Sequence, residues 1–245
     1  MSVQIVLVHG IRTSGTMWRS QVEYLDARGY RTAAVDLPGH GTRIGGDFTL
    51  DGALRTIDAA VRVAAEHGPV LLVGHSLGGL LCLAYAGSTD AAPLAGLVAA
   101  SCTALPIGAG LAWYRAVTRL TNMLPDQGRW ISGRMLAATI PLETRGDFGA
   151  GGYALDAQDA VLRSLSDLDL LTAVSRIDVP LWFVNGQWDQ LRVNERLFQR
   201  LAPHAELIVV PRTTHLVTAM RPAVFNAALQ VAIATLEQDD ARDAS

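Results

Sequence analysis

The sequence contains no lysine, so all 20 of its cationic residues are arginine. Enzymes that form a Schiff base with a carbonyl substrate, or that hold pyridoxal phosphate, use a lysine amine for the covalent link. The absence of lysine therefore excludes both kinds of chemistry. Cysteine is almost as scarce, because Cys82 and Cys102 are the only two and no CxxC pair indicates a metal or redox site. We expect both thiols to be small buried side chains.

Other absences exclude further classes of protein. The net charge is −3, so no basic surface for nucleic acid or anionic membranes is expected. No GxGxxG or Walker pattern joins a strand to a helix, which leaves no sign of a nucleotide site. Pro93 and Pro106 interrupt the uncharged run 91–114 and favour a buried strand and a loop over a membrane span. An apolar run begins almost at the amino terminus and leaves no room for a signal peptide. We expect a soluble cytoplasmic protein with no metal and no cofactor.

Short apolar runs alternate with segments of helical period along most of the 245 residues. Such runs are typical of strands covered by helices on both faces, and the alternation predicts a parallel sheet in an α/β fold. The predicted strands are 3–8, 31–37, 69–74, 95–101, 180–186 and 205–211. The predicted helices lie near 16–28, 50–67, 77–87, 192–201 and 220–236. Functional groups in such a sheet gather at the carboxyl ends of its strands.

The alternation breaks in the interval 103–170, which is too long for a plain loop. It contains two amphipathic helix candidates, GLAWYRAVTRLTNML and GRWISGRMLAATI. We predict a helical cap at 103–170, inserted into a core formed by 1–102 and 171–245. A glycine cluster at 146–152 inside it is interpreted as a flexible connection. The candidate substrate-binding residues of the cap are Trp113, Tyr114, Trp130 and Met135.

The strongest functional signal is Gly-His-Ser-Leu-Gly at 74–78, between a predicted strand and a predicted helix. This is the G-x-S-x-G nucleophile elbow, in which a strained turn exposes a serine hydroxyl and tolerates little bulk on either side. Ser76 is therefore the candidate nucleophile. The N–H of Leu77 lies at a helix amino terminus, where it can stabilise an oxyanion. The N–H of Ile11, in the turn after the first strand, is the candidate second donor.

A serine nucleophile needs a general base and a carboxylate to orient it. Among six histidines, only His215 follows the carboxyl end of the last strand, on the same edge as Ser76. Asp189 follows the preceding strand at that edge and is the candidate acid. Asp167 and Asp169, where the cap returns to the core, remain as alternatives.

These pieces resemble the α/β-hydrolase superfamily. The matching features are HG after the first strand, Trp18 in the next helix, DLPGHG at 36–41, GHSLGG at 74–79, NGQWD and TTHL. The resemblance implies the α/β-hydrolase fold with a mostly parallel, doubly wound sheet, the triad order Ser, Asp, His, and carboxylic-ester hydrolysis. Because the chain starts at the strand before the HG loop, we expect the family's first antiparallel strands to be missing, which leaves about six strands.

The functional hypothesis is a serine carboxylesterase that acts on a small-to-medium apolar ester through an acyl-enzyme on Ser76. Lactones, amides, thioesters and carbon–carbon bonds of diketones remain open as alternatives, because the same machinery cleaves them. A ligand-binding receptor with vestigial activity is a further alternative. Hydroxynitrile lyases of this fold rely on a lysine, which is absent, and haloalkane dehalogenases place an aspartate at the elbow. The sequence leaves the oligomeric state open.

Overall fold

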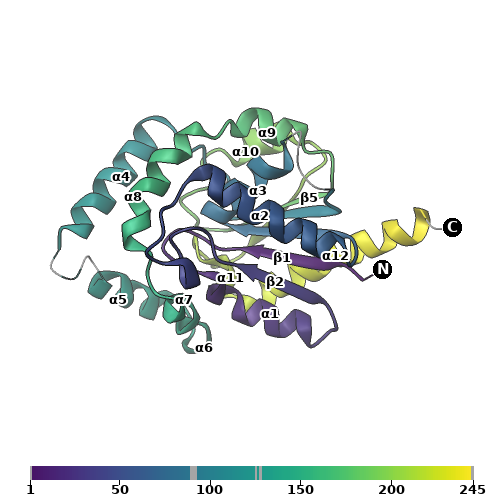
Figure 1. Cartoon of the computed structure of the whole chain (residues 1–245), viewed down its shortest axis with the longest axis horizontal. Helices are drawn as coiled ribbons and strands as arrows, with labels where there is room; N and C mark the ends of the chain where they lie inside the picture. Colours follow the sequence, from purple (N-terminus) through teal and green to yellow (C-terminus); the bar gives the residue numbers. More distant parts are fainter. Residues whose placement is uncertain (1, 89–92, 125, 127–128, 244–245) are drawn as a thin grey trace.

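A single parallel sheet of six strands forms the centre of the computed structural model, which describes residues 2–88, 93–124, 126 and 129–243 (Figure 1). The strand order is β2-β1-β3-β4-β5-β6. The strands are β1 Gln4–Val8, β2 Arg31–Val35, β3 Val70–His75, β4 Gly96–Ala100, β5 Leu181–Gly186 and β6 Glu206–Val210. Each one lies within a predicted strand to within a residue or two, so the predicted α/β sheet is confirmed.

Helices cover both faces of the sheet because side chains of each strand point alternately to opposite faces. From β1, Val6 and Val8 join an apolar core with α2 and α3, whereas Ile5 and Leu7 join a second core with α1 and α12. The helices of these layers are α1 Arg19–Asp26, α2 Leu50–Ala65, α3 Leu77–Ala86, α9 Leu170–Arg176, α10 Glu195–Leu201 and α12 Pro222–Asp243. The central strand β3 is buried along its whole length.

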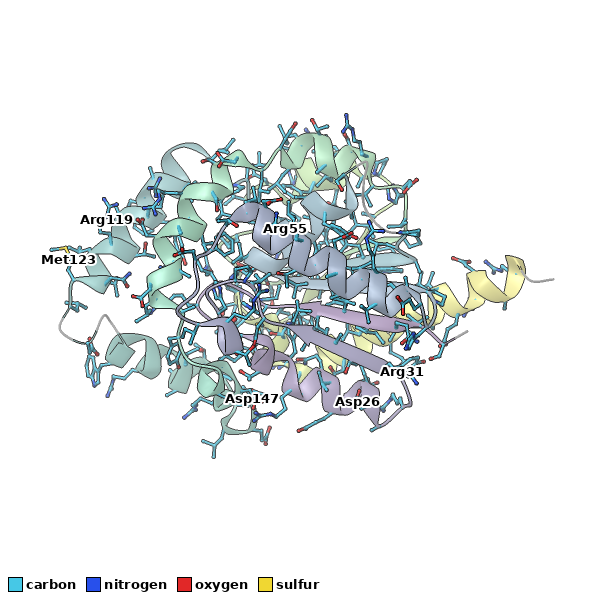
Figure 2. The ribbon with its side chains drawn as sticks, viewed as in Figure 1. Asp26, Arg31, Arg55, Arg119, Met123 and Asp147 are labelled. Atoms are coloured by element: carbon cyan, nitrogen blue, oxygen red, sulfur yellow. The ribbon has the colours of Figure 1, made fainter. Side chains whose placement is uncertain are left out.

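The insertion after β4 lies at the end of the molecule opposite the two termini (Figure 1). Its helices are α4 Gly108–Asn122, α5 Arg129–Thr139, α6 Leu142–Arg145, α7 Asp147–Ala150 and α8 Leu155–Ser164. Arg119 and Met123 of α4 lie at the outer edge of this end, far from Arg31 on β2 (Figure 2). The predicted helical segments of the insertion are thus present, with α4 and α5 outermost.

The segment with the glycine cluster at 146–152, predicted to be a flexible connection, contacts the core through Asp147 and Phe148. Arg19 of α1 forms an ion pair with Asp147 of α7, with 2.6 Å between Nη1 and Oδ1. The hydroxyl of Thr16 donates to the carbonyl of Asp147 at 2.6 Å, and Phe148 is only 3 % exposed. Gly151 permits close packing, since a Cβ there would lie 2.1 Å from the Ser14 hydroxyl oxygen, whereas nothing lies within 4 Å of a Cβ on Gly146.

The two cysteines and the strand within the uncharged run 91–114 were predicted to lie in the interior of the protein. Cys82 and Cys102 are both buried free thiols, as predicted, and burial raises the pKa of each. From residue 93 onward, the uncharged run contains the buried strand β4 and a loop before α4 starts at Gly108. Over the described ranges, no helix combines the length and the apolar character that crossing a bilayer requires.

Candidate active site

The turn between β3 and α3 places Ser76 in a strained backbone conformation, with φ +54° and ψ −116°. Residues other than glycine rarely adopt a positive φ, and such strain clusters at functional sites. The flanking glycines are required by contact. A Cβ on Gly74 would lie 2.5 Å from the carbonyl oxygen of Gly78, and a Cβ on Gly78 would lie 2.3 Å from that of Val8. The sequence therefore forms a tight elbow that presents the serine hydroxyl at the carboxyl edge of the sheet.

Three side chains meet at this edge, each from the loop after a different strand. The hydroxyl of Ser76 donates to Nε2 of His215 at 2.9 Å. Nδ1–H of His215 donates to the carboxylate of Asp189, at 3.2 Å from Oδ1 and 3.3 Å from Oδ2. The strands β3, β5 and β6 are parallel members of one sheet, so the loops after them reach the same edge.

The carboxylate of Asp189 is ionised although its side chain is fully buried. Burial acts to raise its pKa, but the hydrogen bond and electrostatic attraction of His215 and the N–H of Leu191 outweigh it, so the pKa lies below its usual value. The Leu191 N–H donates to Asp189 at 2.8 Å. An ionised acceptor at Nδ1 holds the imidazole in the tautomer whose Nε2 lone pair faces Ser76.

The alternative acids lie elsewhere. Asp167 and Asp169 are exposed at the start of the return to the core. The carboxylate of Asp169 accepts the N–H of Thr172 at 3.2 Å and caps helix α9. Of the three candidates, Asp189 is the aspartate that contacts His215.

The two candidate oxyanion donors belong to the elbow and to the loop after β1. Leu77 is the first residue of α3, and Ile11 belongs to the loop after β1. Within the described ranges, neither of these N–H groups has an acceptor. The β1 loop packs directly on the elbow, since a Cβ on Gly10 would lie 3.4 Å from Cβ of Ser76. The N–H of Leu77 therefore directly follows the nucleophile, and the loop that carries Ile11 contacts the elbow.

The predicted substrate-binding residues of the cap differ in how far their side chains are exposed to solvent. Trp113 and Trp130 are 70 % and 67 % exposed, and the guanidinium of Arg134 lies 5.2 Å from the Trp130 ring centre. Tyr114 is 41 % exposed, and the pKa of its hydroxyl is raised because burial outweighs the opposing charge of Arg12 in the β1 loop. The side chain of Met135 lies outside the described part of the structure.

The remaining histidines of this region are neutral and hydrogen-bonded to backbone. The Leu37 N–H donates to Nε2 of His9 at 3.1 Å, and Nδ1–H of His9 donates to the Gly10 carbonyl at 2.8 Å. Nε2–H of His75 donates to the backbone carbonyl of His215 at 2.9 Å. The sequence interpretation assigned His75 to loop structure and missed this contact, which joins residues 140 positions apart. Among the described residues, no group of three or more acidic, histidine or cysteine side chains could hold a metal ion.

Protonation of the buried His9 and His75 is expected to make folding sensitive to mild acid. Burial and a neighbouring histidine lower the pKa from 6.5 to about 4 for His9 and about 3 for His75. The unfolded chain then binds more protons, so stability present above pH 6.5 is lost as the pH falls toward these values. From about pH 7 to about pH 5, each histidine removes about 2 kcal/mol from the free energy of unfolding. Urea unfolding measures this, and His9→Asn should remove its share. An unfolding free energy that stays constant over this range would contradict the assignment.

Comparison with known proteins places this site in a family. The family model described as alpha/beta hydrolase family matches residues 5–228. The chain therefore belongs to the alpha/beta hydrolase family, and the resemblance drawn from its motifs is confirmed. The sheet of the described residues has the six strands expected from the sequence, and all of its neighbouring strands are parallel.

Individual relatives match over shorter stretches. The chain is 41 % identical over 76 residues to a pyrethroid hydrolase of Sphingobium wenxiniae, covering 31 % of this chain and 27 % of the relative. It is 30 % identical over 165 residues to the magnesium-chelatase 30 kDa subunit of Rhodobacter capsulatus, covering 64 % and 52 %. These matches span less than two thirds of either relative. A carboxylesterase structure from Nitrososphaera gargenis shares the fold, with a TM-score of 0.79 at 16 % identity over 97 % of this chain and 92 % of that one.

Proposed function

We propose that the chain is a cofactor-independent serine hydrolase that cleaves a small-to-medium apolar carboxylic ester. The observation that carries the proposal is the 2.9 Å hydrogen bond from a strained, presented Ser76 hydroxyl to Nε2 of His215. A serine in this state is activated, because its proton has an acceptor and the strained turn holds its oxygen at the carboxyl edge of the sheet.

The reaction proceeds in two half-reactions. In the first, His215 accepts the Ser76 proton while Oγ forms a bond to the carbonyl carbon, and the N–H groups of Leu77 and Ile11 stabilise the oxyanion. His215 then donates the proton to the leaving alcohol, which departs and leaves an acyl group on Ser76. In the second, His215 removes a proton from water, the hydroxide attacks the acyl carbon, and the acid leaves as Ser76 regains its proton. Asp189 stabilises the imidazolium in both.

The exposed apolar side chains of the insertion support the proposal that the substrate is apolar. Trp113, Val117 and Leu120 lie at i, i+4 and i+7 of α4 and are 70 %, 39 % and 69 % exposed, so they form one apolar stripe on that helix. Ligand sites are lined mainly by hydrophobic and aromatic side chains. The similarity to the pyrethroid hydrolase favours hydrolysis over the receptor alternative.

Steady-state turnover of aryl esters tests the proposal. A hydrolase releases product continuously, whereas a receptor with vestigial activity gives little more than one burst per protein. A panel of esters, lactones, amides, thioesters and diketones then separates the scissile bonds that share this machinery. If the protein turns over a lactone or diketone but not simple esters, the assignment of the triad stands and the proposed substrate class is wrong.

The cap is expected to select the substrate by chain length. Each buried methylene contributes about 0.8 kcal/mol, so kcat/KM should rise by about three- to fourfold per carbon over a homologous ester series. Trp113→Ala and Tyr114→Ala should flatten this slope, because they remove apolar surface from α4. Val63→Ala, at an exposed apolar position on α2, is the control and should leave the slope unchanged. If kcat/KM of the wild type does not change with chain length, or if both cap variants keep the wild-type slope, α4 does not select the substrate.

A further inference from the structure

We infer that His75 is a positioning residue that holds His215 in place for proton transfer, an inference that rests on the proposed serine hydrolase function. His75 is the last residue of β3 and directly precedes Ser76. Its Nε2–H donates to the His215 backbone carbonyl at 2.9 Å, while the Ser76 hydroxyl donates to the His215 imidazole at 2.9 Å. Two consecutive residues therefore hold His215 at two points, one on its backbone and one on its side chain.

The hydrogen bond from His75 is important because the other backbone contact of the His215 loop connects it to the Asp189 loop and not to the strand of the nucleophile. The N–H of Trp188 donates to the carbonyl of Thr213 at 2.9 Å, which ties this loop to the Asp189 loop. His75 ties the same loop to β3, the strand that carries the nucleophile. The imidazole rings of His75 and His215 lie 5.1 Å apart and are tilted by 49°. With both ties in place, a shift of His215 relative to Ser76 requires breaking a partly buried hydrogen bond.

The environment of His75 suits a neutral donor. His215, Asp189 and His9 are the ionisable groups that face it, and burial followed by the proximity of His215 lowers its pKa to about 3. His75 therefore stays uncharged while His215 becomes an imidazolium during the reaction. It keeps Nε2–H for the carbonyl and adds no second positive charge beside the developing one.

The other ring nitrogen shows that packing alone does not explain a histidine here. Nδ1 of His75 is buried without a hydrogen-bond partner among the described residues, and a Cβ on Gly10 would lie 3.0 Å from it. An unpaired buried acceptor costs free energy that an apolar side chain of similar size would avoid. The donation from Nε2–H to His215 is the contact that an apolar residue cannot make.

The test compares His75→Gln, His75→Asn and His75→Leu on ester turnover. In Gln, the Nε2–H donor is as many bonds from Cα as the Nε2–H of histidine. The amide nitrogen of Asn is one bond closer to Cα, and Leu has no donor. We expect Leu and Asn to lower kcat by about 10- to 100-fold with KM within about twofold, because the defect lies in proton transfer rather than in binding. Gln should recover kcat to within about threefold of the wild type. His67→Leu, the same change at an exposed site before β3, is the control.

The outcomes separate this inference from the function on which it rests. If Ser76→Ala keeps wild-type turnover, the proposed function fails. If turnover depends on Ser76 but His75→Leu matches the wild type, or His75→Gln is as slow as His75→Asn, the positioning role is overturned. Urea unfolding of each variant accompanies the kinetics. An unfolded His75→Gln protein would assign the side chain to packing and overturn the role as well.

Discussion

Replacing Ser76 with alanine is expected to lower kcat for ester hydrolysis by about four to six orders of magnitude. The hydroxyl is the group whose oxygen bonds to the substrate carbon, and no other side chain takes its place at the elbow. KM should change little, since the oxyanion donors and the cap remain. The positive φ at this position is equally strained for alanine, so the free energy of unfolding should change by less than about 1 kcal/mol.

Ser175→Ala is the matched control for this change. The hydroxyl of Ser175 donates to the carbonyl of Thr172 at 2.9 Å on the exposed surface of α9. Its loss should leave kcat and KM unchanged. A Ser76→Ala protein that folds and keeps more than about one hundredth of the wild-type kcat would show that another group attacks the substrate.

Asp189→Asn is expected to lower kcat by about four orders of magnitude, a loss of the size known for the corresponding change in a serine protease triad. The amide can donate to Nδ1 of His215, which then favours the tautomer with its proton on Nε2. That proton faces Ser76, so the imidazole can no longer accept the serine proton. Steady-state kinetics with an aryl ester measure the effect, and intact near-ultraviolet circular dichroism establishes that the fold is retained.

Asp169→Asn is the control that the sequence itself suggests. Asp169 caps α9 through the Thr172 N–H, so its loss should cost at most about 1 kcal/mol of stability and leave turnover unchanged. If Asp169→Asn proved the more damaging change for turnover, the acid would have to be moved to the boundary of the insertion.

The core fold and the three meeting side chains were predictable because local chemistry fixes them. Near-continuous apolar runs such as Val70–Val73 define the strands, and the loops after parallel strands share one edge. Gly74 and Gly78 indicate the elbow in the sequence, because backbone atoms of the following helix and of β1 lie where a side chain at these positions would be. The choice of His215 and Asp189 followed from their positions after the last two strands.

The attachment of the insertion and the role of His75 could not be predicted in the same way. Arg19 and Asp147 are separated by 128 residues, and neither belongs to a motif. A glycine-rich segment indicates conformational freedom, but here Gly151 permits close packing on Ser14. His75 was interpreted as a turn residue because the contact that matters is with a backbone carbonyl, and a carbonyl has no sequence signature.

Reaction with an aryl phosphonate tests the central claim most directly. The phosphorus stands in for the tetrahedral carbon of the transition state and reacts covalently with an activated serine. The account predicts one equivalent of added mass per chain, located by peptide mapping at Ser76, with labelling abolished in Ser76→Ala and slowed in Asp189→Asn. Label on a different serine, or none in a protein that turns over esters, would contradict the assignment of Ser76 as nucleophile.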